Sequence, residues 1–203
     1  MSAPTVVGDV VVGAERYGGH GVLLTIAEPA YVPAVVRALG GRAGWGSVLV
    51  PGDVDPGRVL ARVSTVPLVS TEFRRDREIT VPVVYDGADL DRVADHFGRT
   101  RAEVVAAHAA ATYTVVMLGF GRAFPYLAGL PPDLRGLPRL ATPRATVPAG
   151  SVAIVADMAG IYPAEMPGGW ALIGTTALAL FDPTCDPPTP LAPGVRIRFE
   201  VAT

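Results

Sequence analysis

The stretch from Ser151 to Thr176 reads SVAIVADMAGIYPAEMPGGWALIGTT, and its texture predicts the fold class of the second half of the chain. Two apolar runs, SVAIVA and ALIGTT, stand on either side of a segment rich in proline and glycine. Similar runs recur as YTVVML, ALALF and VRIRFEV, and thirteen of the twenty prolines follow residue 124. Short β-type runs separated by Gly/Pro turns are typical of an all-β barrel or sandwich. We therefore expect residues 111–203 to form a β-barrel.

Residues 1–78 have a different pattern and predict a small α/β domain. The order of its elements allows a ferredoxin-like arrangement, and the charged stretch 72–78 is a candidate linker. A connecting strand and a helical pair should occupy residues 79–110, so the fold class is α+β. Periodicity and turn residues in the first domain predict strands at 6–12, 22–26 and 47–50 and helices at 32–39 and 56–64.

The helical pair has its own start and stop signals. Asp89 can cap the first helix, Gly98 ends it, and Thr100-Arg-Ala-Glu103 is a capping-box pattern for the second. A helix, a glycine turn and a helix also allow a DNA-binding interpretation. The second helix offers Arg101 as its single basic group, with Ala and Val where base contacts are needed. A packed helical pair is favoured.

The bulk composition excludes several classes of chemistry. All seventeen basic residues are arginine, so the chain lacks a phosphate-loop lysine, a Schiff-base lysine and a lysine general base. The three histidines lack ligand-like spacing, and we expect no metal site. A net charge of -2 gives no reason to expect nucleic acid or a membrane surface as a partner. No apolar run approaches the roughly 20 residues of a membrane span. The lone Cys185 fits a reducing, cytoplasmic location.

Four clusters could carry chemistry, and each also has an ordinary structural explanation. His108 lies near a helix end, and the aromatic side chains of GFGRAFPYL (119–127) could wall a pocket or plug a barrel end. Arg139 and Arg144 each follow a proline, which suits bidentate capture of a carboxylate or phosphate, although both could be solvated. Glu165, in GIYPAEMPGGW, could belong to a site or merely to a corner.

These motifs, taken in order, resemble a known family. HAAATYTVVMLGF, FPYLAGL, PRLATPRATVPAGSVAI, GIYPAEMPGGWALIG and LFDP are similar to segments of the family that contains the Kip inhibitor and the B component of 5-oxoprolinase. The same module is found in urea carboxylase and is also called allophanate hydrolase subunit 1. The resemblance is close over residues 79–203, including VPVVYDGADLDRVADHFGRTRAEVVAAH, and weaker over 1–78.

The resemblance implies a cyclophilin-like β-barrel at the C-terminus and a larger partner, the C component of 5-oxoprolinase. With a third subunit, such a pair opens 5-oxoproline to L-glutamate in an ATP-dependent reaction. The implied enzyme is a hydrolase of cyclic amides, with ATP and Mg bound jointly with the partner. Two alternatives remain open: a regulatory protein that inhibits a sensor histidine kinase, and a subunit of a urea-type carboxyltransferase.

Matching the family's motifs residue by residue implies a set of site residues. His108 and Glu165 would be the catalytic groups. This chain departs from the family at Arg122 and Ala123, where proline and glycine are usual, and at Thr175, where arginine is frequent. These departures put strict 5-oxoproline specificity in doubt. The expected substrate-binding residues are Phe124, Tyr126, Arg139, Arg144, Gly168, Gly169 and Trp170.

Overall fold

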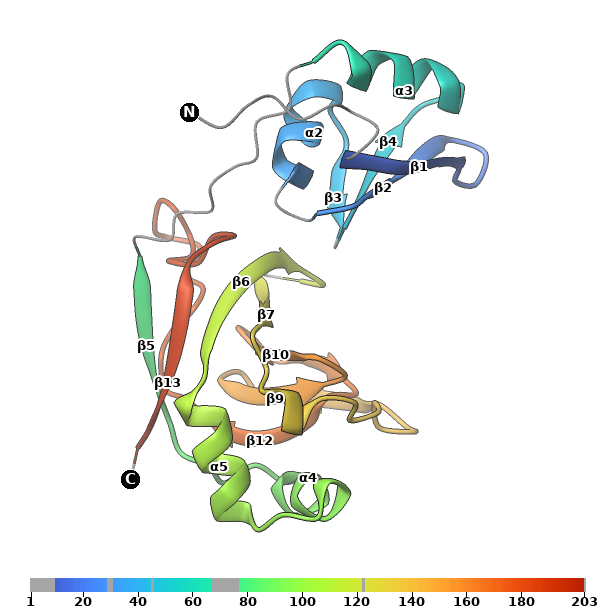
Figure 1. The fold of residues 1–203 in the computed structure, drawn as a ribbon. Coiled ribbons are helices and arrows are strands. Elements are labelled where there is room, and N and C mark those ends of the chain that lie inside the picture. Colours follow the sequence, from blue (N-terminus) through green and yellow to red (C-terminus); the bar gives the residue numbers. More distant parts are fainter. Residues whose placement is uncertain (1–9, 29–30, 45, 67–76, 122, 203) are drawn as a thin grey trace. The chain divides into compact units, whose positions relative to one another are not determined.

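The computed structural model describes residues 10–28, 31–44, 46–66, 77–121 and 123–202, and all structural statements refer to these ranges. The chain divides into two compact units, Met1–Phe73 and Arg74–Thr203 (Figure 1). Each unit has its own apolar core, and each is described by itself.

The first unit is an antiparallel sheet with two helices. The strand order is β1-β2-β4-β3. Strand residues alternate between the two faces, so that Val22, Leu24, Val48 and Val50 enter the core. The strands are β1 (Val11–Arg16), β2 (Gly21–Ile26), β3 (Arg42–Gly44) and β4 (Ser47–Pro51), and the helices are α2 (Val32–Leu39) and α3 (Pro56–Ser64).

Both helices and the strands β2 and β4 confirm the sequence prediction, but the first strand does not. It runs over Val11–Arg16 rather than 6–12, and residues 6–9 lie outside the described ranges. A ferredoxin-like arrangement is not confirmed either. In that fold, the strand beside the first strand of the motif follows the second helix. Here the neighbour of β2 is β1, which precedes it and joins it through a tight turn.

The second unit is built on a seven-stranded curled sheet in the order β12-β9-β10-β7-β6-β13-β5 (Figure 1). Every pairing is antiparallel except β13 with β5. A separate two-stranded sheet pairs β8 (Arg144–Val147) with β11 (Met166–Gly168). The large sheet contains β5 (Glu78–Val83), β6 (Thr112–Gly119), β7 (Phe124–Ala128), β9 (Ser151–Val155), β10 (Met158–Ile161), β12 (Ala171–Thr175) and β13 (Arg196–Val201).

The curl brings the two edges of this sheet together. Val84, just after β5, forms a bridge with Thr175 at the end of β12, through N–H···O bonds of 2.9 and 2.8 Å. Two strands that would otherwise expose unpaired backbone groups therefore meet at one point. The expected β-rich second half is confirmed as a curled sheet within a mixed α/β chain. Its cyclophilin-like identity stays a prediction.

The segment 79–110 is part of the second unit. Its strand β5 lies in the sheet, and α4 (Leu90–Phe97) and α5 (Arg101–Ala110) bury Val93 and Val104 in the same core. The capping box is confirmed, because the Thr100 amide donates to Glu103 Oε2 at 2.8 Å and the Glu103 amide donates to Thr100 Oγ1 at 3.3 Å. The pair packs on the sheet, as expected, and Pro132–Leu134 adds a short 3-10 helix, η2.

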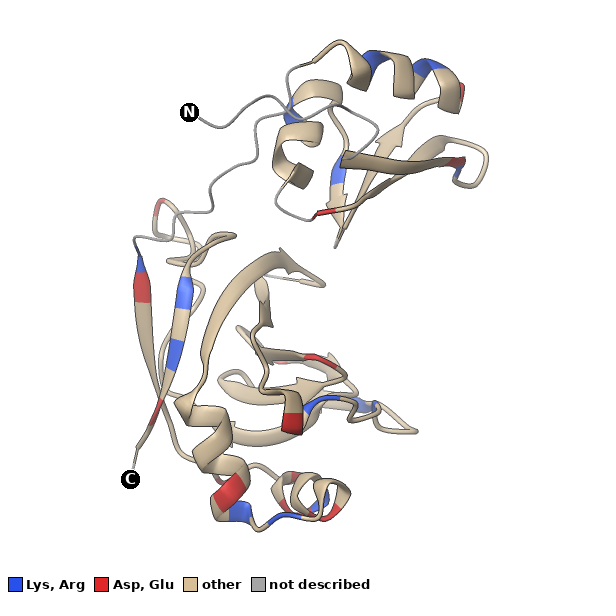
Figure 2. Cartoon of the chain, viewed as in Figure 1, with Lys and Arg blue, Asp and Glu red and all other residues tan. Residues whose placement is uncertain are grey.

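Charged side chains are unevenly distributed over the second unit. Figure 2 shows them on α4, α5, β5, β13 and the loops, whereas β6, β7, β9, β10 and β12 carry none. This part of the sheet must therefore be stabilised by apolar packing on both faces. The five uncharged strands carry the aromatic residues considered below.

Gly87 offers a sharp test of this packing. A Cβ at this position would collide with the backbone of Leu172, Ile173 and Gly174, none of which can move aside like a flexible side chain. We predict that Gly87→Ala lowers the free energy of unfolding by about 3 kcal/mol. Gly98→Ala is the matched control, since its Cβ meets nothing within 4 Å and only the left-handed backbone (φ 61°) is strained. This control should cost about 1 kcal/mol. Chemical denaturation measures both, and equal losses would contradict the packing described.

Candidate functional site

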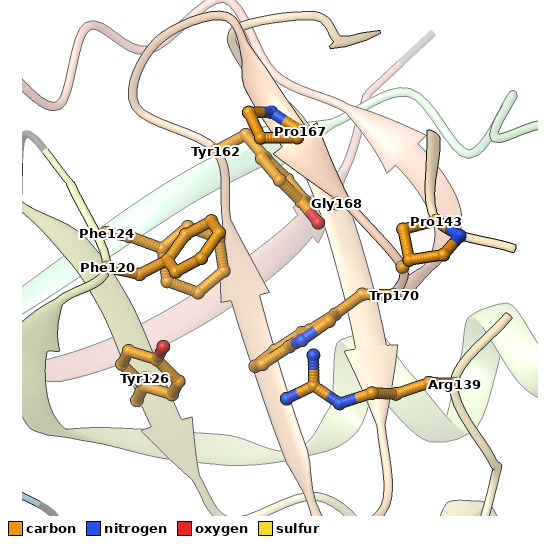
Figure 3. Close-up of a pocket in the computed structure, with 10 residues that line it drawn as sticks. Phe120, Phe124, Tyr126, Arg139, Pro143, Tyr162, Pro167, Gly168 and Trp170 are labelled. Carbon is orange, nitrogen blue, oxygen red and sulfur yellow. The ribbon is translucent and has the colours of Figure 1, made fainter. Parts of the chain in front are cut away.

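A cavity of about 320 Å³ opens beside the aromatic part of the curled sheet (Figure 3). The hairpin of β6 and β7, the end of β10, the strand β11 and the loop before β8 contribute its walls. These segments are separated by up to about fifty residues in the chain, so the cavity is a product of the tertiary fold. The lining residues are Phe120, Phe124, Tyr126, Arg139, Pro143, Tyr162, Pro167, Gly168, Gly169 and Trp170.

Phe124 is the centre of the aromatic wall. Its ring makes edge-to-face contacts with Tyr126, Tyr162 and Trp170, with centroid distances of 5.2, 5.0 and 5.2 Å. Edge-to-face pairs at these separations add specific attraction to the apolar burial of the rings. Phe120 completes the wall at 6.3 Å from Phe124 but is 65% exposed, so its ring forms the open rim.

Two glycines make room for these rings. A Cβ at Gly160 would lie 2.7 Å from Phe124 and 2.9 Å from Trp170, and a Cβ at Gly168 would collide with the Tyr162 ring and hydroxyl. Both contacts are too short for any other residue type unless the aromatic side chains move. The glycines of GIYPAEMPGGW are therefore required by the rings that pack across them.

Arg139 contributes the positive charge at the cavity. Its side chain is exposed, but the backbone on either side of it is fixed. Arg92 Nη2, from α4, donates to the Pro138 carbonyl at 3.1 Å, and the Leu140 amide donates to the Gly169 carbonyl at 2.8 Å. The loop is thus tied to the helix on one side and to the glycine pair on the other, and Figure 3 shows the guanidinium beside Trp170.

The polar groups of the cavity are hydrogen-bond donors. Burial raises the pKa of Tyr126, and the nearby Arg139 partly offsets this. Burial also raises the pKa of Tyr162, offset in part by the Trp170 backbone and by the guanidinium groups of Arg139 and Arg144. Both phenols are therefore protonated at neutral pH and can donate. No carboxylate lines the cavity, so its chemistry suits a ligand that has a flat or apolar body, accepts hydrogen bonds and carries negative charge.

Arg144 does not line this cavity. Its Nη2 donates to Asp89 Oδ1 at 2.8 Å, while Asp89 Oδ2 accepts from the Leu172 amide at 2.7 Å. The Asp89 side chain is 7% exposed and that of Arg144 is 30% exposed. Asp89 begins α4, as predicted, but makes no side-chain capping bond. The tertiary contacts use both of its oxygens instead, and the prediction of a local cap is wrong.

His108 also lies away from the cavity. It is 0% exposed, Nδ1 lies 2.8 Å from the Tyr85 hydroxyl, and its ring packs against Tyr113 and Phe199 at centroid distances of 5.2 and 4.5 Å. Burial lowers the pKa of His108 to about 3, so the imidazole is neutral at physiological pH. Its Nε2 is buried and has no hydrogen-bond partner among the described residues.

The remaining sequence candidates separate into two groups. Phe124, Tyr126, Arg139 and the run Gly168–Trp170 come together around the cavity, whereas Glu165 is exposed on the turn before β11 and does not line it. The hydroxyl of Thr175 donates to Asp86 Oδ1 at 3.0 Å. Arg122 lies outside the described residues. The sequence analysis missed Tyr162, Pro143 and Pro167 as lining residues, although all three stand within or beside motifs that it had singled out.

Metal and membrane sites were searched within the described ranges. No group of three or more His, Cys, Asp or Glu side chains in those ranges could hold a metal ion. Likewise, none of the helices described is long and apolar enough to cross a membrane.

Comparison with known proteins places this fold and cavity in a class. A family model of the carboxyltransferase domain, subdomain C and D, matches residues 43–191, well over half of the chain. The chain therefore belongs to this carboxyltransferase-domain family.

Individual relatives narrow the comparison. The B component of 5-oxoprolinase from Escherichia coli O157:H7, named as a subunit of that enzyme, is 51% identical over 126 residues, which are 61% of this chain and 57% of that protein. The crystal structure of TTHA0988 matches with a TM-score of 0.74 and 35% identity, over 90% of this chain and 40% of that one. The Kluyveromyces lactis urea amidolyase matches with a TM-score of 0.76 over 94% of this chain and 15% of its own, and its 19% identity supports the fold alone. The chain thus spans little more than half the length of the curated relative, and the resemblance to the family of the 5-oxoprolinase B component is confirmed.

The Asp89–Arg144 pair generates a stability prediction. Asp89→Ala leaves the guanidinium of Arg144 and the Leu172 amide without their acceptor, and we expect a loss of about 2 kcal/mol in unfolding free energy. Asp91→Ala, on the same helix, is the control. Its exposed ion pair with Arg101, at 3.4 Å, should contribute less than about 0.5 kcal/mol. Urea titrations of the two variants compare them, and equal effects would show that Asp89 is not a structural clamp.

His108 predicts the direction of a pH dependence. Because its pKa is lowered in the folded state, the unfolded chain binds a proton below about pH 6.5 that the folded chain refuses. Stability should therefore fall by about 1.4 kcal/mol per pH unit from this group as pH decreases from about 6 toward 4. His108→Gln should remove this contribution, while His96→Gln, at an exposed histidine, should retain it. Denaturation midpoints at several pH values test this. An unchanged slope in His108→Gln would contradict the buried, neutral imidazole.

Proposed function

We propose that this chain is a subunit of a 5-oxoprolinase-type hydrolase that acts with a larger partner, of the C-component type, to convert 5-oxoproline to L-glutamate. The observation that carries the proposal is the aromatic cavity, lined by hydrogen-bond donors and by Arg139 and lacking any carboxylate. The name of the 51% identical relative, a 5-oxoprolinase subunit, supports the same reaction class. A larger partner is supported by the word subunit in that name and by the inclusion of this fold in the longer urea amidolyase chain.

The chemistry of 5-oxoproline fits the cavity. The molecule is a five-membered lactam ring with a carboxylate and an amide carbonyl. In the proposed complex the ring lies on the aromatic wall around Phe124, and the carboxylate contacts the guanidinium of Arg139. The hydroxyls of Tyr126 and Tyr162 are the available donors for the lactam carbonyl. Such contacts hold the ring in one orientation and exclude water from its apolar edges.

The cavity does not fit ATP. A triphosphate needs several positive or backbone donors, whereas the cavity offers one guanidinium and the whole chain has no lysine. In the proposed enzyme, ATP and Mg are therefore held mainly by other subunits. This chain's residues supply substrate binding and orientation, within a cyclophilin-like barrel that works in the cytoplasm.

The two proposed catalytic residues have different surroundings. Glu165 stands exposed on the turn that carries Pro167 and Gly168 toward the cavity, so its carboxylate is free to reach a partner subunit. His108 is buried away from the lining residues, and its contribution is to the core beneath β13. We therefore propose that Glu165, rather than His108, completes the catalytic groups at a surface shared with the partner.

A regulatory function is the second candidate, and Phe120 is the observation that favours it. Its ring is 65% exposed at the rim, where a side chain of a target protein such as a sensor histidine kinase could pack. The two functions differ in what Phe120→Ala does. Loss of inhibition of a kinase without loss of 5-oxoproline turnover would favour the regulatory function.

Turnover by the reconstituted enzyme tests the leading proposal. With the larger subunit and the third subunit present, ATP hydrolysis should depend on 5-oxoproline. Arg139→Ala should raise KM more than it lowers kcat and should reduce kcat/KM about 100-fold, because a charged hydrogen-bond partner of the carboxylate is lost. Arg101→Ala, on the exposed side of α5, is the control and should turn over like the parent.

Two outcomes of this assay would count against the proposal. The first is the absence of 5-oxoproline-dependent hydrolysis when all subunits are present and folded. The second is an Arg139→Ala variant whose kcat/KM matches that of the Arg101→Ala control.

A further inference from the structure

A second cavity, of about 290 Å³, lies in the first unit, and the proposed hydrolase does not use it. It is formed at the end of the four-stranded sheet, where the tight turn between β1 and β2 meets the start of β3 and the end of β4. Its lining includes Tyr17, His20, Gly21, Arg42, Leu49 and Pro51.

Strand register explains why a hollow exists here. Leu49 pairs with Arg42 on one side and with Leu23 on the other, while Gly21 pairs with Pro51. Because side chains alternate along a strand, Leu49 faces away from the core that its buried neighbours Val48 and Val50 enter. A Cβ at Gly21 would come within 3.0 Å of Leu49 and 3.2 Å of the Val50 carbonyl, so the missing side chain leaves the floor of the cavity open.

The turn over this floor is fixed by backbone bonds. The Tyr17 amide donates to the Gly21 carbonyl at 2.9 Å, and the Gly52 amide donates to the His20 carbonyl at 2.7 Å. These bonds hold Tyr17 and His20 on one wall of the cavity, opposite Arg42 and Pro51. Tyr17 is 58% exposed, which leaves much of a flat aromatic ring open to solvent.

The charges at this cavity are positive and unpaired. Arg16, on β1, is neutralised by Asp53 at 3.1 Å, but Arg42 has no ion-pair partner within the described part of the chain. The lining contains no carboxylate, and His20 adds a second nitrogen donor beside the glycine turn. The rest of the lining, with Tyr17, Leu49 and Pro51, is apolar or aromatic. A molecule that satisfies both parts has a flat apolar body and an oxyanion.

We propose that this cavity is a binding site for a small organic anion whose flat apolar part lies between Tyr17 and Leu49. Its carboxylate or phosphate contacts Arg42, with His20 as a further donor. The ligand joins two interactions that are each weak alone. A ring without the oxyanion loses the contact with Arg42, and an oxyanion without the ring loses the packing against Tyr17.

Three probes separate these contributions in calorimetric or NMR titrations of the full chain. Phenyl phosphate and benzoate each combine a ring with an oxyanion, whereas inorganic phosphate lacks the ring. We expect at least one ring-bearing probe to bind with a dissociation constant of about 1 mM or lower and more tightly than inorganic phosphate. The tighter of the two identifies phosphate or carboxylate as the preferred group. Arg42→Ala and Tyr17→Ala should each weaken binding about tenfold.

Two control variants make the assignment specific. Arg58→Ala removes an exposed arginine from α3 in the same unit, and Arg139→Ala removes the cation of the other cavity. Neither should change the affinity of the ring-bearing probe. The proposal is overturned if neither ring-bearing probe binds saturably or if Arg42→Ala binds like the parent. It is also overturned if Arg139→Ala, rather than Arg42→Ala, abolishes binding, and none of these results bears on turnover of 5-oxoproline.

Discussion

The buried carboxylate of Asp89 joins three segments of the second unit that are far apart in the sequence. From the start of α4 it accepts the Leu172 amide of β12 and the guanidinium of Arg144 in β8. A carboxylate with so little exposure is tolerated because both oxygens have donors and one donor is charged. β8 pairs with β11, which contains Pro167 and Gly168, so the same contact sets the position of one wall of the aromatic cavity.

The cavity combines that clamp with the packing of aromatic rings over glycine. Phe124 can touch three other rings because Gly160 presents no side chain beneath it, and Tyr162 can lie over Gly168 for the same reason. The Arg139 loop is then tied in place by Arg92 and by the Gly169 carbonyl. The result is an apolar surface with donors and one cation, which suits a small cyclic anion better than a nucleotide. Since the chain spans little more than half of its curated relative, groups outside the present residues complete the proposed chemistry.

Much of the fold could be predicted from the sequence, because the patterns involved are local. The capping box at Thr100 and Glu103 and the helix 32–39 depend on residues within one or two turns, and both were predicted. The aromatic residues of FPYL and the glycines before Trp170 could also be assigned to a pocket. Their bulk and conformational freedom have few other uses in a charge-free segment.

The failures share a physical cause, which is that side-chain partners come from distant strands. Arg144 resembles Arg139 in sequence, since both follow proline, yet it pairs with Asp89, fifty-five residues away. Asp89 itself looks like a local cap until Leu172 takes its second oxygen. Tyr162 carried no signal of its own, because its place in the cavity depends on the contact with Gly168. Resemblance to a family identified the motifs but not which of their side chains face the cavity.

The account depends most on the claim that the aromatic cavity receives the lactam carboxylate. ¹⁹F NMR of 5-fluorotryptophan in a Trp45→Phe chain observes Trp170 alone, since the chain has two tryptophans. Mixed with the unlabelled larger subunit and titrated with 5-oxoproline, the Trp170 resonance should shift saturably, and the shift should disappear in Arg139→Ala. An unshifted resonance in a complex that turns over 5-oxoproline would place the substrate elsewhere and contradict the account.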